Sequence, residues 1–464
     1  MQIHPRLHRF RRTFIGYFFV CLVWAIGIAM PAKSQGGQPD YLELAQKAAA
    51  FIQGIDSFPW PDDTRTPLVI SNDIGDGMAG KLLFFIELYR VTKSEQYLVS
   101  IRRVADYLSN NIPDSLPMAA PGFKRPSGLY YGSAGIMVAL YESYEVTGNP
   151  AYLTNAARYL RLLETSAEKT EHGLMWGKYN DVLNGSAGTG LGLLYAAEKM
   201  KRPVTLSLAQ QAGTQLLAKI VPDSPVNGTL YWYLHTERKI NLPNFSHGTA
   251  GIGYFLARLY EKTGHKPFLD AAIRAASYLD LHASRTNGLL LLPYGIPNEG
   301  YTSKHDLGWA HGNAGSARLF VQLSRITRNS NWRNLTQECI NTILKSGVPG
   351  KLDSVFGKDS LQIDNRFDLA GIANFLVDIY PHFKDKRIIE KAEEIAHYIT
   401  GRAIITNNEM YWPVKQYAFM ETPGKEAVFT GYFYGNAGMG LLYLKLHAHK
   451  TGRKFATRLP DDPF

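Results

Sequence analysis

Apolar residues in this chain follow a helical period, and each helical run begins after a glycine-rich turn. After Gly77-Met78-Ala79-Gly80, apolar residues fall on the spacing of one helix face, at Leu82, Leu83, Ile86, Leu88 and Tyr89. A second helical pattern with an alanine-rich face follows a turn, as in residues 150–162. No stretch alternates apolar and polar residues for long enough to require a sheet. The pattern therefore predicts an all-α protein built from helical pairs.

The glycine-rich turn occurs seven times, at intervals of 53 to 67 residues, which suits two helices and two loops per unit. Six copies read Gly-x-Ala-Gly and begin at Gly77, Gly132, Gly185, Gly248, Gly312 and Gly435, and a less regular copy begins at Asp368. Because a single hairpin cannot bury both of its faces, we expect about seven hairpins to close into an α,α-toroid with inner and outer helix layers. The glycines allow tight turning and close packing at the helix starts, or they expose N–H groups to ligand oxygens.

The first 34 residues differ in composition from the rest. Four arginines precede an apolar run at 14–30, and Pro31-Ala32-Lys33-Ser34 offers small residues for cleavage. We predict a signal peptide at 1–34, a toroid domain at 35–452 and a C-terminal tail at 453–464, in a protein exported to the periplasm or secreted. An uncleaved membrane anchor is the alternative. Arg11-Arg12 also fits twin-arginine export.

Charge and cysteine content exclude several classes of function. Removing the five positive charges of the leader from the net charge of +10 leaves +5, and no basic run with interleaved aromatics follows. We therefore expect no nucleic-acid partner, and no stable membrane association after cleavage. Only Cys339 remains after cleavage, which excludes an intramolecular disulfide and a cysteine-based metal site.

Seven helical pairs opened by Gly-x-Ala-Gly resemble the lanthionine synthetase C-like family over roughly residues 40–452. The resemblance implies an α,α-toroid. In the cyclases of this family, two cysteines and a histidine hold a zinc ion that activates a peptide thiolate. Here Ala310 stands at the first cysteine position, and Arg366 and Phe367 replace the Cys-His pair. We predict that the chain has no zinc cofactor, because the thiolate and imidazole ligands are missing.

Two other family positions are kept. Asp181 matches the active-site aspartate of an Asp-x-x-x-Gly pattern, and His247 in Ser246-His247-Gly248 matches a catalytic histidine. Asp306 replaces the family's arginine, four residues before Ala310. We take Asp181, His247 and Asp306 as candidate catalytic residues. His247 could transfer protons near neutral pH, or simply begin a helix. Asp181 could be a general base or a cap of its loop.

Further carboxylates lie near the same helix starts, including Asp73 and Asp306 at positions that we take as equivalent to Asp181, and Asp368. Paired carboxyl groups at one toroid mouth would suit a glycosidase, although helix caps are the alternative interpretation. His311, Asp73, Trp309 and Asp368 are the candidate binding residues. His305, His311, His247 and Asp368 could also form a substitute metal site.

Three functions remain open. The chain acts on or binds a peptide or similar ligand through Asp181 and His247 without zinc, it is a carbohydrate-active toroid that uses rim carboxylates, or it is a non-catalytic binding protein. The sequence leaves the oligomeric state undetermined.

Overall fold

The computed structural model describes residues 40–116, 127–223, 228–297, 305–352, 354–356, 369–414 and 426–464, and the backbone of two strands within 118–124. Residues 40–464 form one compact unit. The predicted leader lies outside the described residues. Within the described ranges, no helix has the length and apolar character needed to span a membrane.

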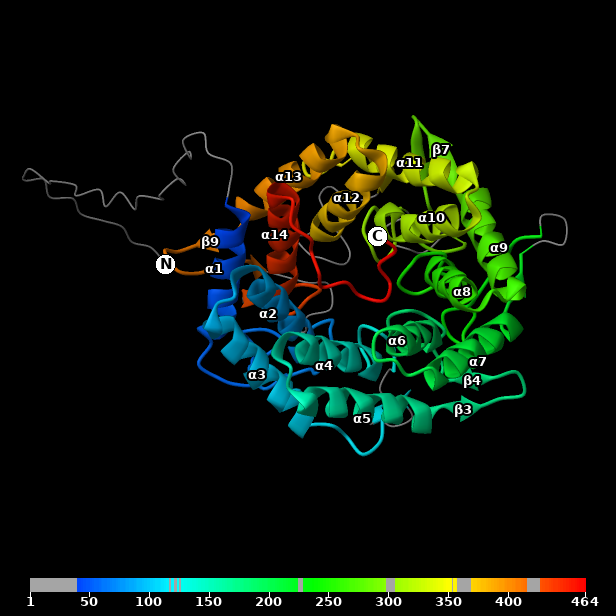
Figure 1. Cartoon of the computed structure of the whole chain (residues 1–464). Helices are drawn as coiled ribbons and strands as arrows, with labels where there is room; N and C mark the ends of the chain where they lie inside the picture. Colours follow the sequence, from blue (N-terminus) through cyan, green and yellow to red (C-terminus); the bar gives the residue numbers. More distant parts are fainter. Residues whose placement is uncertain are drawn as a thin grey trace, which may run out of the picture. The chain divides into compact units, whose positions relative to one another are not determined.

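An inner layer of seven helices surrounds the axis of this unit (Figure 1). Each inner helix packs against the next, and the last packs against the first, so that the layer closes. Their glycine-rich first turns and apolar sequences let them be buried on nearly all sides. The inner helices are α2 (Met78–Thr92), α4 (Ser133–Thr147), α6 (Ser186–Glu198), α8 (Thr249–Thr263), α10 (Asn313–Thr327), α12 (Leu369–Phe383) and α14 (Asn436–Thr451).

An outer layer of amphipathic helices covers the inner one. Six of them follow their inner partner directly, but α14 is paired with α1 (Tyr41–Gln53) from the other end of the unit. The seventh pair therefore joins the two ends of the unit, and the predicted α,α-toroid is confirmed. The other outer helices are α3 (Glu95–Asn110), α5 (Pro150–Ser166), α7 (Val204–Ala218), α9 (Lys266–His282), α11 (Ser330–Lys345) and α13 (Lys386–Thr400).

Short antiparallel strand pairs and one 3₁₀ turn (Ser354–Phe356) lie in the loops between helices. The hydrophobic pattern does not predict them, because two or three residues are too few to show an alternating period. The pairs are β1 (Met118–Ala120) with β2 (Phe123–Lys124), β3 (Glu168–Lys169) with β4 (Leu174–Met175), β5 (Val221–Pro222) with β6 (Leu230–Tyr231), β7 (Ser284–Thr286) with β8 (Leu289–Leu291), β9 (Ile404–Ile405) with β10 (Met410–Tyr411), and β11 (Pro413–Val414) with β12 (Ala427–Val428).

The glycine-rich turns bring neighbouring units into close contact. A Cβ atom on Gly251 would lie 2.0 Å from the Phe245 carbonyl oxygen and 2.7 Å from Val182 Cγ2 of the preceding unit. On Gly80 it would lie 2.8 Å from Tyr432 Cβ, across the junction between the last unit and the first. Glycine is required at these positions because no side chain fits between the units. The predicted packing role is therefore confirmed for these two copies.

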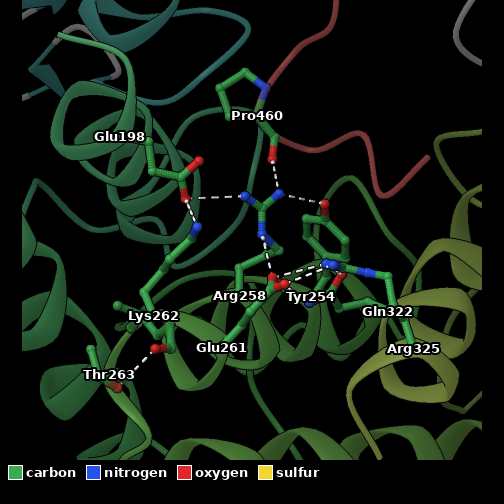
Figure 2. A network of polar contacts seen from close by, with 10 residues as sticks. Glu198, Tyr254, Arg258, Glu261, Lys262, Thr263, Gln322, Arg325 and Pro460 are labelled. Atoms are coloured by element: carbon green, nitrogen blue, oxygen red, sulfur yellow. Dashed lines mark hydrogen bonds and ion pairs between the residues drawn. The ribbon is translucent and has the colours of Figure 1, made fainter. Parts of the chain in front are cut away.

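The last ten residues pack inside the ring of inner helices. Arg258 of α8 donates hydrogen bonds to the Pro460 carbonyl oxygen at 3.3 Å and to the Tyr254 hydroxyl at 3.2 Å, and it pairs with Glu198 and Glu261 (Figure 2). Figure 1 shows this segment, in red, running from α14 into the space that the inner helices surround, where the chain ends. A stretch that the sequence marks only as a tail is therefore part of the packed interior.

Candidate active site

The residues before the inner helices form the same hydrogen-bonded turn in three units. In each, a side-chain oxygen accepts a hydrogen bond from the backbone N–H three residues later, which is the local turn that aspartate and asparagine favour. The bonds join Asp73 to Asp76, Asp181 to Asn184 and Asn244 to His247, all at 3.0 Å. The later residue of each pair directly precedes the glycine that begins the inner helix. One repeated turn therefore presents a different side chain in each unit.

Asp181 and His247 come from adjacent units and are in direct contact. Oδ1 of Asp181 holds its own turn, while Oδ2 lies 2.8 Å from Nδ1 of His247. The Asp181 side chain is fully buried, whereas the His247 side chain is 20% exposed. Asp181 is thus both a turn cap and the partner of the histidine, so the two interpretations of this residue do not exclude each other.

His311 continues the site into the next unit. Its ring centroid lies 5.6 Å from that of His247 and 4.2 Å from that of Tyr294. His311 precedes Gly312 as His247 precedes Gly248, which explains why the two rings meet. Tyr294 follows the β7–β8 pair, and no sequence motif marks it.

Asp306 is not equivalent to Asp181, and that prediction is wrong by two positions. The N–H of the helix-start alanine bonds to the carbonyl seven residues earlier, Ala187 to Asn180 and Ala314 to Leu307. Counted from these bonds, Asp181 corresponds to Gly308, and Asp306 precedes that position. Oδ1 of Asp306 accepts a hydrogen bond from the Gly308 N–H at 2.8 Å, so this buried carboxylate has a capping role.

Asp73 does correspond to Asp181, and Tyr131 before Gly132 stands where His247 stands for Asp181; a buried lysine of α2 also interacts with Asp73 through its charge. Lys81 of α2 is fully buried, and its ammonium group donates to the Asp76 carbonyl oxygen at 3.1 Å and lies 3.8 Å from an oxygen of Asp62. Burial raises the pKa of Asp73 to about 7, and the negative charge of Asp76 adds to this. Burial lowers the pKa of Lys81 to about 8, against the attraction of Asp62.

A cavity of about 470 Å³ opens beside Asp73. Its wall includes Tyr131 and Ser133 at the start of α4, and Asn184 from the third unit. Asn184 is bonded to Asp181 twice, by its backbone N–H at 3.0 Å and by its side-chain amide at 3.4 Å. Asn184 therefore belongs to the wall of the cavity and is also bonded to the partner of His247.

Known proteins share this architecture. The family model described as lanthionine synthetase C-like protein matches residues 69–355. The chain belongs to this family. Nisin cyclase is similar in structure to this lanthionine synthetase C-like chain, with a TM-score of 0.58 and 14% identity over 85% of this chain and 92% of the cyclase. At this identity the likeness shows the fold.

Two carbohydrate enzymes also match the lanthionine synthetase C-like chain. They are a D-mannose isomerase (TM-score 0.46, 15% identity, 79% of this chain and 99% of that one) and the GH76A α-1,6-mannanase from Salegentibacter sp. HEL1_6 (TM-score 0.44, 16% identity, 77% and 98%). No curated protein matches the sequence significantly.

Of the three positions that the resemblance assigns to zinc ligands, the structure describes Ala310 alone. Ala310 offers only a methyl group, and it is fully buried. Cys339 lies in the outer helix α11, where burial raises the pKa of its thiol to about 12. In the described part of the chain, no three His, Cys, Asp or Glu side chains are arranged to hold a metal ion. Arg366, Phe367 and Asp368 lie outside the described residues, so a substitute site with Asp368 stays a prediction.

Trp309 lies among the aromatic residues that fill the toroid axis. Its ring centroid is 4.9 Å from that of Tyr130 and 5.6 Å from that of Phe245, and the side chain is 5% exposed. Trp309 also lines a pocket together with Tyr130 and Arg318, so its predicted binding role stays a prediction. Asn184 is a residue that sequence reasoning missed, although its place before Gly185 matches that of His247 before Gly248.

Proposed function

We propose that this chain is an exported acid–base enzyme that acts on a peptide or carbohydrate ligand through His247, without the family's zinc. The observation that carries the proposal is the 2.8 Å contact between Nδ1 of His247 and the buried carboxylate of Asp181. A carboxylate can only accept a hydrogen bond, so this contact requires the proton of neutral His247 on Nδ1. The lone pair then lies on Nε2.

This arrangement suits proton transfer. When Nε2 takes a proton from a ligand, the imidazolium that forms remains 2.8 Å from a negative charge that is shielded from water. A positioned general base of this kind typically contributes about 10²–10⁴-fold to a rate. His311, with its ring 5.6 Å from that of His247, is a second polar group for a bound ligand.

Turnover of two substrate classes tests the proposal. A peptide that contains cysteine and dehydroalanine, and a panel of neutral oligosaccharides, would be incubated with metal-free protein. The sugars would be followed by chromatography, and the peptide by mass spectrometry after alkylation of its remaining free thiol, because cyclisation itself leaves the mass unchanged. We expect one class to be converted, and the rate to fall at least about 100-fold in His247→Ala and in Asp181→Asn.

Matched controls separate chemistry from folding. His265→Ala changes an exposed histidine at the start of the outer helix α9, and Asp385→Asn changes an aspartate that caps α13. Both should retain the full rate. Equal rates in all five proteins would remove His247 and Asp181 from the mechanism. Stoichiometric zinc in the purified protein, measured by mass spectrometry, would contradict the zinc-independent part of the proposal.

A further inference from the structure

The 470 Å³ cavity beside Asp73 has the size of a small-ligand site, which is typically about 300–1,000 Å³. Residues at three helix starts enclose it, together with the segment after α3 and Tyr159 of α5. The first is the loop before α2, with Asn72 and Asp73, and the second is the start of α4, with Tyr131 and Ser133. The third is Asn184 from the loop before α6. These walls come from three consecutive units, so the closed ring of helices holds them in place.

The chemistry of the lining favours an uncharged ligand with many hydroxyl groups. Amide, hydroxyl and carboxyl groups, which can donate and accept hydrogen bonds, stand beside the tyrosine rings of Tyr131 and Tyr159. The described residues that line the cavity offer hydroxyl, amide and carboxyl groups, and none of them is a Lys, Arg or His. Aromatic faces with interspersed polar groups suit the apolar and hydroxylated faces of a sugar ring.

Asp73 can take part as a donor or an acceptor. Its Oδ1 accepts a hydrogen bond from the Asp76 N–H, and burial together with Asp76 raises its pKa to about 7. Near neutral pH a substantial fraction of this carboxyl is therefore protonated, and the protonated form can donate a hydrogen bond to a hydroxyl oxygen.

We infer that this cavity binds a neutral carbohydrate at a site that adjoins the Asp181–His247 pair, because Asn184 lines the cavity and is bonded to Asp181. The inference rests on the proposed function for its catalytic side, since it names the substrate class for the neighbouring Asp181–His247 pair. The binding of a sugar by the cavity stands by itself and can be measured without turnover.

Calorimetric titration of the whole protein tests the inference. The probes are cellobiose, maltose and α-1,6-mannobiose as neutral sugars, cellobionate as an anionic counterpart, and trialanine as a peptide. We expect at least one neutral disaccharide to bind with a Kd of about 1 mM or below. Asp73→Asn should weaken this binding at least about tenfold, because asparagine lacks both the negative charge and the exchangeable carboxyl proton.

Asp73→Asn should keep the fold, since Asn244 forms the same turn in the fourth unit. Asp40→Asn is the matched control, because Asp40 also accepts backbone N–H bonds at a helix start and lies outside the cavity lining. Its titration should equal that of the wild type. Thermal unfolding of each variant checks that the fold is retained.

The outcomes separate this inference from the proposed function. No binding of any of the three neutral disaccharides at 10 mM overturns the inference, and so does tighter binding of cellobionate or trialanine that Asp73→Asn abolishes. A sugar that binds, is weakened by Asp73→Asn and is not converted supports the sugar site while contradicting the acid–base function. Conversion of the dehydropeptide without any sugar binding supports the acid–base function and contradicts the sugar site.

Discussion

The segment 455–464 inside the ring gives a prediction whose magnitude follows from named contacts. The hydroxyl of Thr457 donates to Oε2 of Glu87 at 2.6 Å and accepts from Nη1 of Arg90 at 2.8 Å. Glu87 is 1% exposed, and it also accepts hydrogen bonds from the backbone N–H groups of Ala456 and Thr457. Thr457→Val keeps the shape and the backbone bonds but removes the hydroxyl.

Hydrogen bonds to charged groups contribute about 1.5–3 kcal/mol each. The bond to Glu87 is buried and should contribute its full free energy. The Arg90 side chain is partly exposed and retains its ion pair with Glu142 at 2.5 Å, so the loss of its bond to Thr457 should cost less. We therefore expect Thr457→Val to lower the free energy of unfolding by about 2–4 kcal/mol. Urea unfolding followed by tryptophan fluorescence measures it. Thr451→Val is the control, because its hydroxyl bonds only to carbonyl oxygens of its own exposed helix end. Equal, small losses of unfolding free energy in both variants would mean that the Thr457 hydroxyl does not stabilise the fold through Glu87 and Arg90.

Three further predictions follow from single sites. Because the pKa of Asp73 is raised from 3.8 to about 7, the native state holds its proton more tightly than the unfolded chain. Stability should therefore fall as pH rises from about 4 to 7, and Asp73→Asn should flatten this part of the urea midpoint profile. ¹⁵N NMR of the neutral protein should show the proton of His247 on Nδ1, and Asp181→Asn should shift the tautomer ratio, while an unchanged ratio would contradict the pairing. Gly190→Ala should destabilise by about 1–3 kcal/mol in the same urea assay, because its Cβ would lie 2.2 Å from the Phe255 ring, and a loss below about 0.5 kcal/mol would refute the overlap.

The inner layer could be predicted from the sequence because its signal is local. Each Gly-x-Ala-Gly block is followed by apolar residues at helical spacing, and Gly148 and Gly264 do adopt the positive φ of 68° that the pattern requires. The pairing of α1 with α14 could not be predicted in this way. It joins residues about 400 positions apart, and neither helix carries a motif that names its partner.

The candidate site was predictable only in part. Asp181 and His247 follow from the family resemblance, and the structure brings them into contact. Asp306 lies two positions before the equivalent of Asp181, because the glycine-rich helix start, and not the carboxylate, keeps a constant place in each unit. Tyr294 reaches His311 from a loop between the layers, and such a contact depends on the tertiary fold alone.

Backbone hydrogen bonds between neighbouring turns hold the ring together, so the side chains at these turns can differ between units without loss of the fold. Neighbouring turns are joined by backbone hydrogen bonds, among them Ser246 N–H to the Ala310 carbonyl at 3.1 Å. Ala310 stands at the family's cysteine position, yet its contribution to the ring is a carbonyl oxygen that any residue supplies. The same kind of turn occurs in two units directly before the helix-start glycine. It positions Asn184 in the third unit and His247 in the fourth. The turn fixes the backbone but accepts different side chains at its last position. A substitution in one unit can therefore change the chemistry at the mouth of the toroid without altering the other units.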